Sequence, residues 1–210
     1  MSVMLDIIGS MVIRGAIVLM TLYLSVGLQS AYTYKSTLYI VKQKTVVPAE
    51  VLTDDIRLAG YGPTTSKIFA TATPEAMQFY ADINNDSIPE TVHYYLGTAY
   101  GGSNHRSLYR EVSSINGGAP FELARDVDSL CFTYYDSYGN TVSGSNVSGI
   151  KSIKVSLVME SSAQMADEIT TAPTSSGLYS HEDTANTGTT NFPTKYVRAF
   201  WERTVFPQNL

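Results

Sequence analysis

The chain has 210 residues and carries 14 lysines and arginines against 19 aspartates and glutamates, a formal net charge of −5. This acidic balance excludes the broad basic face that nucleic-acid binding requires. A single cysteine excludes an internal disulfide and a cysteine-rich zinc site. Only 16% of the residues are charged while 15 are tyrosine, a composition that favours an extracytoplasmic β-rich domain over a cytosolic enzyme.

The first thirty residues predict a membrane helix. Residues 7–28 read IIGSMVIRGAIVLMTLYLSVGL and hold one charge, that of Arg14. As a helix this segment is about 33 Å long, enough to cross a hydrocarbon core. Asp6 precedes it instead of a basic n-region, and no clear A-x-A cleavage site follows, so we favour an uncleaved span over a removed signal peptide.

The orientation of this span stays open at the level of sequence. Lys35, Lys42 and Lys44 follow it, and a positive-inside count would place the C-terminal side in the cytoplasm. The tyrosine-rich polar remainder favours the outside.

The helical pattern continues beyond the span. Apolar and aromatic residues recur at near-helical spacing, so residues 5–59 are expected to form one very long helix, apolar all round at first and amphipathic later. Pro48 removes a backbone donor and clashes with the preceding turn, so we expect the helix to kink or break there. The expected organisation is a long N-terminal helix, residues 1–59, followed by a globular domain, residues 60–210.

The remainder alternates between apolar and polar residues with a period of two, which predicts antiparallel strands. The predicted strands are 76–83, 91–96, 107–112, 127–135, 150–159 and 196–205. An antiparallel sheet packed on a helix is an α+β architecture. Residues 161–194 are too polar and too long for a hairpin loop, so we expect an exposed excursion with a short helix near 163–169.

An acidic turn joins the first two predicted strands. Its oxygen donors alternate in a way that is similar to a calcium loop: Asp82, Asn84, Asp86, the carbonyl of Ile88, and Glu90. The pattern departs from an EF-hand, because Ser87 replaces the glycine and His93 replaces the bidentate glutamate. Bound calcium is one hypothesis, and a polar turn closed by Asx hydrogen bonds is the other.

Several stretches occur in the order found in one known family. They are LTDDIRLAGYG (52–62), FYADINNDSIPETVHYYL (79–96), SLYREV (107–112), DVDSLCFTYYDSYGN (126–140), SGIKSIKVSLVMES (148–161) and WERTVFPQNL (201–210). Together with the ground plan of a long apolar helix and a sheet, they resemble type IV pilins, in particular the large minor pilins and the J-type pseudopilins of type II secretion. The start, MSVMLDIIGS, departs from the family's leader and GFTLIE-like box, and Asp6 is the one acid available for the role of the glutamate in that box.

The resemblance implies a structural subunit of an extracellular or periplasmic pilin-like filament. Such a subunit is inserted in the inner membrane before assembly and then packs with copies of itself or with other pilin-like subunits. Under this interpretation Asp6 and Arg14 form an intersubunit pair in the filament core, although Asp6 in the headgroups and a snorkelling Arg14 would also satisfy the sequence. Small residues that allow close helix approach lie in the same segment: Gly9, Ser10, Gly15, Ala16 and Gly27.

Two other function classes compete with the filament. One is a monomeric, single-span anchored extracytoplasmic binding domain, such as an adhesin. The other is an anchored hydrolase, but the sequence holds no G-x-S-x-G, H-E-x-x-H or glycine-rich phosphate loop, and His93, His105 and His181 lie in unrelated segments. We therefore expect no catalysis and no cofactor other than the calcium hypothesis.

Overall fold

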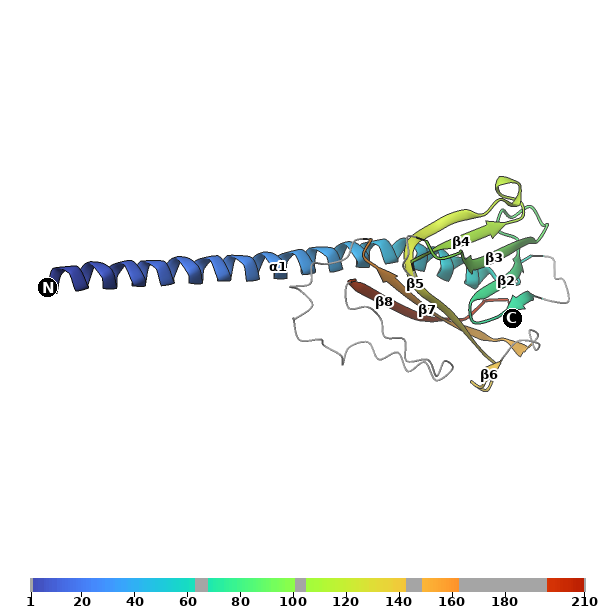
Figure 1. Cartoon of the computed structure of the whole chain (residues 1–210). Helices are drawn as coiled ribbons and strands as arrows, with labels where there is room; N and C mark the ends of the chain where they lie inside the picture. The colour runs from blue at the N-terminus through green and yellow to red at the C-terminus, as the bar shows by residue number, and fades with distance from the viewer. Residues whose placement is uncertain (1, 63–67, 101–104, 143–148, 163–195, 210) are drawn as a thin grey trace.

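Helix α1 (Ser2–Leu58) dominates the shape of the computed structural model. Its 57 residues extend for about 85 Å, and its first half projects well beyond the rest of the chain (Figure 1). The structure describes residues 2–62, 68–100, 105–142, 149–162 and 196–209. The predicted excursion and its short helix therefore lie outside the described residues, except for Ser161 and Ser162.

Of the kink or break expected at Pro48, the break is not found, because α1 runs through this residue as a continuous helix, and the kink stays a prediction. A proline inside a helix costs about 3 kcal/mol. Pro48 is buried in the contact with the sheet, as are Thr45, Ala49 and Leu52 on either side of it. Burial of this helix face offsets the lost hydrogen bond, so tertiary packing holds the helix together where local preference would end it.

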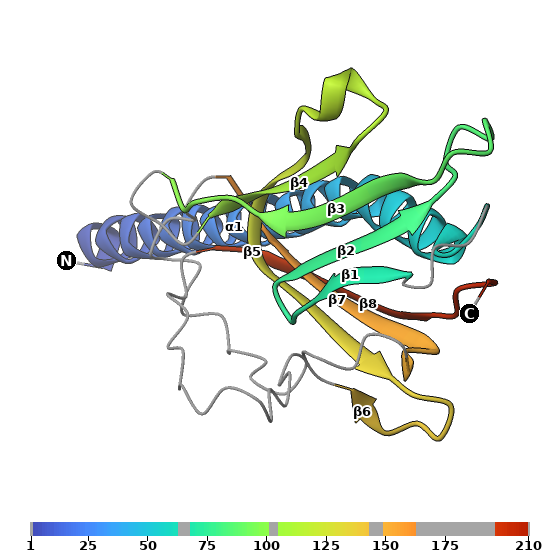
Figure 2. The same cartoon turned by 90° about the vertical axis from the view of Figure 1, so that its right-hand side faces the viewer.

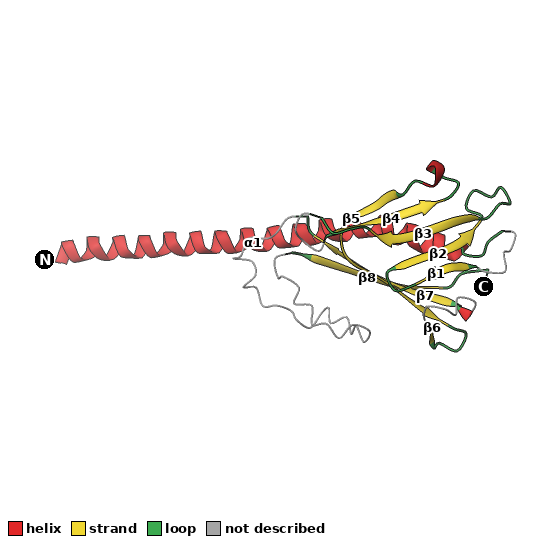
Figure 3. Cartoon of the chain, turned by 45° about the vertical axis from the view of Figure 1, so that its right-hand side comes forward, coloured by secondary structure: helices red, strands yellow, loops and turns green. Residues whose placement is uncertain are grey.

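The strands form one antiparallel sheet over the described part of the chain (Figure 3). They are β1 (Phe69–Ala72), β2 (Ala76–Ala81), β3 (Glu90–Leu96), β4 (Arg106–Val112), β5 (Phe121–Tyr135), β6 (Thr141–Val142), β7 (Ser152–Glu160) and β8 (Arg198–Val205), with a short 3-10 helix η1 (Asn116–Gly118) after β4. Their order is β1-β2-β3-β4-β5-β7-β8, and β6 pairs with β5 at the side of this path. The predicted α+β class and the hairpin of β2 and β3 are confirmed.

The core lies between the second half of α1 and one face of the sheet (Figure 2). On β3, Val92 and Tyr94 are fully buried while His93 and Tyr95 are only half-buried, which is the alternation that the sequence predicts. The helix contributes Leu52 and other apolar side chains of the same face. Each fully buried large apolar side chain contributes roughly 1.5–3 kcal/mol, so this contact fixes the sheet on the helix.

Three strand segments were not predicted: β1, β6 and the first half of β5. β6 has two residues, too few for a pattern, and β1 has four with an irregular register against β2. In β5 the backbone of Asp126 has a φ of 61°, and the register shifts next to it against both β4 and β7. This bulge interrupts the alternation, so the pattern was recognisable only after it.

Candidate functional site

The N-terminal half of α1 has no cover within the described chain. Every residue from Asp6 to Gln29 is exposed, and most of these side chains are large and apolar. By length and composition the helix is able to cross a membrane. A surface of this kind needs either lipid or other apolar helices around it.

The charged and small residues of this segment face outward, away from any contact with the described chain. Asp6 and Arg14 are both exposed, and neither has an ion pair with a described residue. An added Cβ at Gly9, Gly15 or Gly27 would meet no atom within 4 Å, so no described neighbour requires glycine at these positions. Ser10 donates to the carbonyl of its own helix at Ile7 over 2.9 Å, and Ala16 is exposed. The room left by these small residues is available to a neighbouring helix.

A buried polar cluster, Asp55–Tyr94–Arg110, joins α1 to β3 and β4. Arg110 donates to both carboxylate oxygens of Asp55, over 2.6 Å and 3.1 Å, and the Tyr94 hydroxyl donates to Oδ2 over 2.5 Å. Burial, and after it the Asp55 carboxylate, raises the pKa of Tyr94 well above its usual range. The tyrosine therefore stays a neutral donor, and the bidentate pair holds the end of the helix at a fixed place on the sheet.

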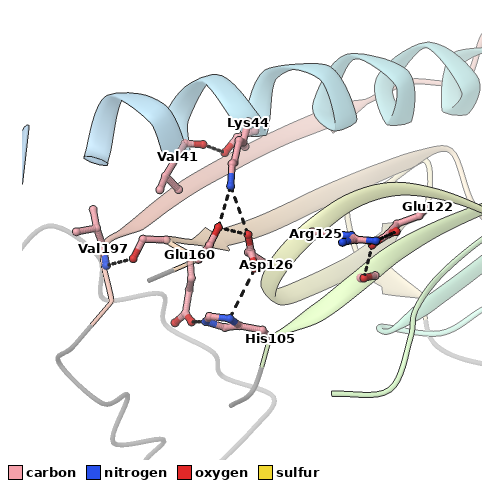
Figure 4. Close-up of polar contacts among 12 residues, drawn as sticks. Val41, Lys44, His105, Glu122, Arg125, Asp126, Glu160 and Val197 are labelled. Carbon is pink, nitrogen blue, oxygen red and sulfur yellow. Dashed lines mark hydrogen bonds and ion pairs between the residues drawn. The ribbon is translucent and has the colours of Figure 1, made fainter. Parts of the chain in front are cut away.

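A second cluster surrounds Asp126 and joins the sheet to α1 at Lys44, on the N-terminal side of Asp55 (Figure 4). Lys44 of α1 lies 3.4 Å from the Asp126 carboxylate, and the Ser162 hydroxyl donates to it over 2.6 Å. The Tyr100 hydroxyl donates to Oδ1 over 3.1 Å. Burial raises the pKa of Asp126, but the hydrogen bonds from Ser162, Tyr100 and Lys44 outweigh it and leave the pKa below its usual range. The carboxylate is thus held ionised beside the lysine of the helix.

The same cluster continues across the sheet through His105. Its Nε2 lies 2.7 Å from Glu160 and its Nδ1 lies 3.7 Å from Asp126. Glu160 also pairs with Arg198, whose Nε is 3.6 Å from Asp128. Burial, and after it the Glu160 carboxylate, raises the pKa of Asp128. Sequence reasoning missed this cluster, because its members come from α1, from β5, β7 and β8, and from the segment just before β4, and they share no local motif.

The acidic turn between β2 and β3 is closed by its own hydrogen bonds. Asp82 accepts from the backbone N–H of Asp86 over 3.1 Å and of Ser87 over 2.9 Å. Glu90 accepts from the N–H of Ile83 over 2.8 Å. These contacts are those of the Asx-turn hypothesis, and they also bring three carboxylates together.

That arrangement fits the calcium hypothesis as well. One oxygen from each of Asp82, Asp86 and Glu90 lies within 4.8 Å of the others. Asn84 accepts from the N–H of Asp86, so its side chain is engaged in the turn, and Ile88 donates to Asp86. Hard carboxylate oxygens are the ligands that Ca²⁺ prefers, and the ion would relieve the repulsion among three carboxylates. Calcium at this turn stays a prediction.

The residues that follow the end of α1 contact the acidic turn. Gly62 has a φ of 98°, and an added Cβ would lie 2.7 Å from the Cβ of Asp82, so only glycine fits. The Tyr61 carbonyl accepts from the N–H of Asp82 over 2.8 Å, and its hydroxyl donates to Asn85 over 3.2 Å. These contacts attach the segment that follows α1 to the turn.

Calcium is expected to raise the melting temperature of the detergent-solubilised full chain. Free calcium at a concentration of about 100 times its dissociation constant would add roughly 2.7 kcal/mol to the free energy of unfolding. Asp86→Asn should abolish the rise and leave the basal melting temperature nearly unchanged, because Asp86 is exposed and an amide oxygen can still accept from Ile88. The control is Asp136→Asn, since Asp136 closes another Asx turn by accepting from Tyr138 and Asn140. Equal melting curves in chelator and in millimolar calcium would leave the plain turn.

The sequence matches no protein-family model, and no curated protein matches it. Among solved structures, the fold is similar to that of a type IV-like pilin from Thermus thermophilus, with a TM-score of 0.50 at 14% sequence identity. The match covers 80% of this chain and 97% of that pilin. At this identity the comparison shows the fold, and the predicted pilin-like fold is confirmed. The narrower resemblance to large minor pilins and J-type pseudopilins stays a prediction.

Proposed function

We propose that this chain is a structural subunit of an extracellular or periplasmic pilin-like filament. Residues 7–28 hold it in the inner membrane until assembly, and the same residues then pack against the helices of neighbouring subunits. The carrying observation is the uncovered apolar half of α1 on a pilin-like fold. Lipid and neighbouring helices are both apolar surroundings, so one surface serves both states.

The extent of the uncovered surface favours a filament over a simple anchor. A single-span anchor needs apolar residues only across the hydrocarbon core, about 20 residues. Exposed large apolar and aromatic side chains continue beyond residue 28, at Tyr32, Tyr39, Ile40, Val46 and Val47. A monomeric binding domain would leave these side chains in water, whereas filament packing covers them.

The role that we propose is structural, and the partners are copies of the chain or other pilin-like subunits. Asp6 and Arg14 would need partners inside such a filament, because an unpaired charge in a low-dielectric core is heavily penalised. The sequence prediction pairs Asp6 with Arg14 of a neighbour displaced by about 12 Å.

Replacing Asp6 with asparagine is expected to reduce filament yield and leave membrane insertion intact. The variant keeps the size of the side chain but loses its charge, and a loss of about 1.4 kcal/mol for each subunit contact weakens each addition step about tenfold. Immunoblots of sheared surface material and of the membrane fraction measure the two outcomes. Asp54→Asn is the control, since Asp54 lies on the same helix, is 71% exposed and pairs only with Arg57 among the described residues. Wild-type yield from Asp6→Asn would contradict a role for the Asp6 charge.

A further inference from the structure

A groove of about 320 Å³ lies between α1 and β8. Ala49 of the helix and Ala199 of the strand are buried at its floor, and Val46 and Trp201 line it higher up. In the described sheet β8 is the last strand, with β7 as its one neighbour. The groove thus opens at an edge of the domain, beside apolar helix residues that the described chain does not cover.

The groove is bordered by three exposed charges: Lys42, Glu50 and Arg203. Within the described residues none of the three has an ion pair, in contrast to Lys44, which pairs with Asp126. Charged side chains that find no partner among these residues are free to select a partner chain by charge.

In a parallel arrangement the charges on the groove are opposite in sign to the charges on the uncovered helix and have the same spacing. Lys42 and Glu50 are eight residues apart on α1, and so are Asp6 and Arg14. Eight residues correspond to about 12 Å along a helix. A parallel copy displaced by 36 residues brings Asp6 level with Lys42 and Arg14 level with Glu50. An antiparallel copy would bring like charges together, so the pattern also sets the direction.

We propose that this groove receives the segment from Asp6 to Arg14 of a second copy, in parallel and displaced by about 54 Å. Asp6 of the second copy pairs with Lys42, and Arg14 pairs with Glu50. At this displacement Gly9 lies level with Thr45 and Ile13 lies level with Ala49. The glycine allows a close approach and the isoleucine enters the groove above the small floor residue.

This inference rests on the proposed filament function, and it adds the axial displacement between two neighbouring subunits. The groove and the helix segment are different surfaces of the same chain, so the contact is heterologous, and with a translation along the axis it builds an open filament. It also assigns partners to Asp6 and Arg14 that differ from the sequence prediction, in which the two residues pair with each other across neighbours.

A charge exchange separates the two assignments. The double variant Asp6→Arg with Arg14→Asp preserves the pairing of these two positions with each other. In the groove, however, it places an arginine against Lys42 and an aspartate against Glu50, so both contacts become repulsive. We expect filament yield from this double variant to fall at least tenfold.

Two compensating changes complete the exchange. Adding Lys42→Glu and Glu50→Lys to the double variant should restore most of the yield, because both groove contacts again join opposite charges. The double and quadruple variants carry the same charges in the span, so restoration cannot arise from membrane insertion.

Cysteine cross-linking tests the same contact without reversing charges. In a Cys131→Ser background, Asp6→Cys with Lys42→Cys should give an oligomer ladder on oxidation of sheared filaments, and Asp6→Cys with Lys35→Cys should not, because Lys35 does not line the groove. Wild-type yield from the charge exchange, failure of the quadruple variant to assemble, or filaments without the 6–42 ladder would each overturn the groove contact. Wild-type cells without filaments would instead overturn the proposed function itself.

Discussion

Replacing Asp55 with alanine is expected to lower the free energy of unfolding of the sheet domain by about 3–5 kcal/mol. Asp55 accepts three hydrogen bonds in the contact between α1 and the sheet, two from Arg110 and one from Tyr94. Its removal leaves a largely buried guanidinium and a buried hydroxyl without their acceptor. The cost is therefore that of an uncompensated charge, and it exceeds that of losing one hydrogen bond.

The neighbouring residue supplies the matched control. Asp54 has the same side chain and pairs with Arg57, but it is 71% exposed, and its replacement by alanine should cost at most about 1 kcal/mol. Urea unfolding of the detergent-solubilised full chain, followed by near-ultraviolet circular dichroism of its 15 tyrosines, measures both variants. Similar midpoints for the two would show that the Asp55 cluster does not hold the helix on the sheet.

A loss of similar size is expected for Glu160→Ala, at about 3–5 kcal/mol. The Glu160 side chain is almost fully buried, lies 2.7 Å from His105 and pairs with Arg198. Without it, the buried His105 and the partly buried Arg198 lose their common carboxylate. His105 also faces Asp126, the partner of Lys44. The change should therefore weaken the contact of Lys44 with Asp126 and loosen α1 from the sheet near residue 44.

Glu202 provides the comparison for this prediction. It pairs with Lys154 over 3.1 Å on the adjacent strand, but both side chains are about one-third exposed. Glu202→Ala should therefore shift stability by no more than about 1 kcal/mol. Protease accessibility of α1 near Lys44 should rise in Glu160→Ala alone; an equal rise in both variants would argue against a specific role for the Glu160 cluster.

Local periodicity predicted the parts of the fold whose patterns are regular. The alternation along β3 and β7 identified these strands, and the apolar helical pattern identified α1 nearly to its end at Leu58. It did not settle whether α1 continues past Pro48, and it missed the bulge of Asp126; at both places contacts from distant segments override the local preference. The break expected at Pro48 did not occur because the residue is buried against the sheet.

The candidate sites divide in the same way. The acidic turn was visible in sequence because its residues from Asp82 to Glu90 are consecutive, and the structure brings three of its carboxylates together. The Asp55 and Asp126 clusters were not visible, since each joins the helix to strands far along the chain. The groove required the structure too, because only the packing of β8 beside α1 places Arg203 and Trp201 next to Lys42 and Glu50.

The central claim is that the uncovered half of α1 packs against other helices in a filament. Electron microscopy of sheared surface material, with immunogold labelling of this chain and mass spectrometry of its mature N-terminus, tests that claim most directly. We expect thin filaments labelled along their length, in which the chain retains residues 7–28. Recovery of the chain only as a monomer in the membrane fraction, with no labelled filament under conditions of full expression, would contradict it and favour the single-span anchor.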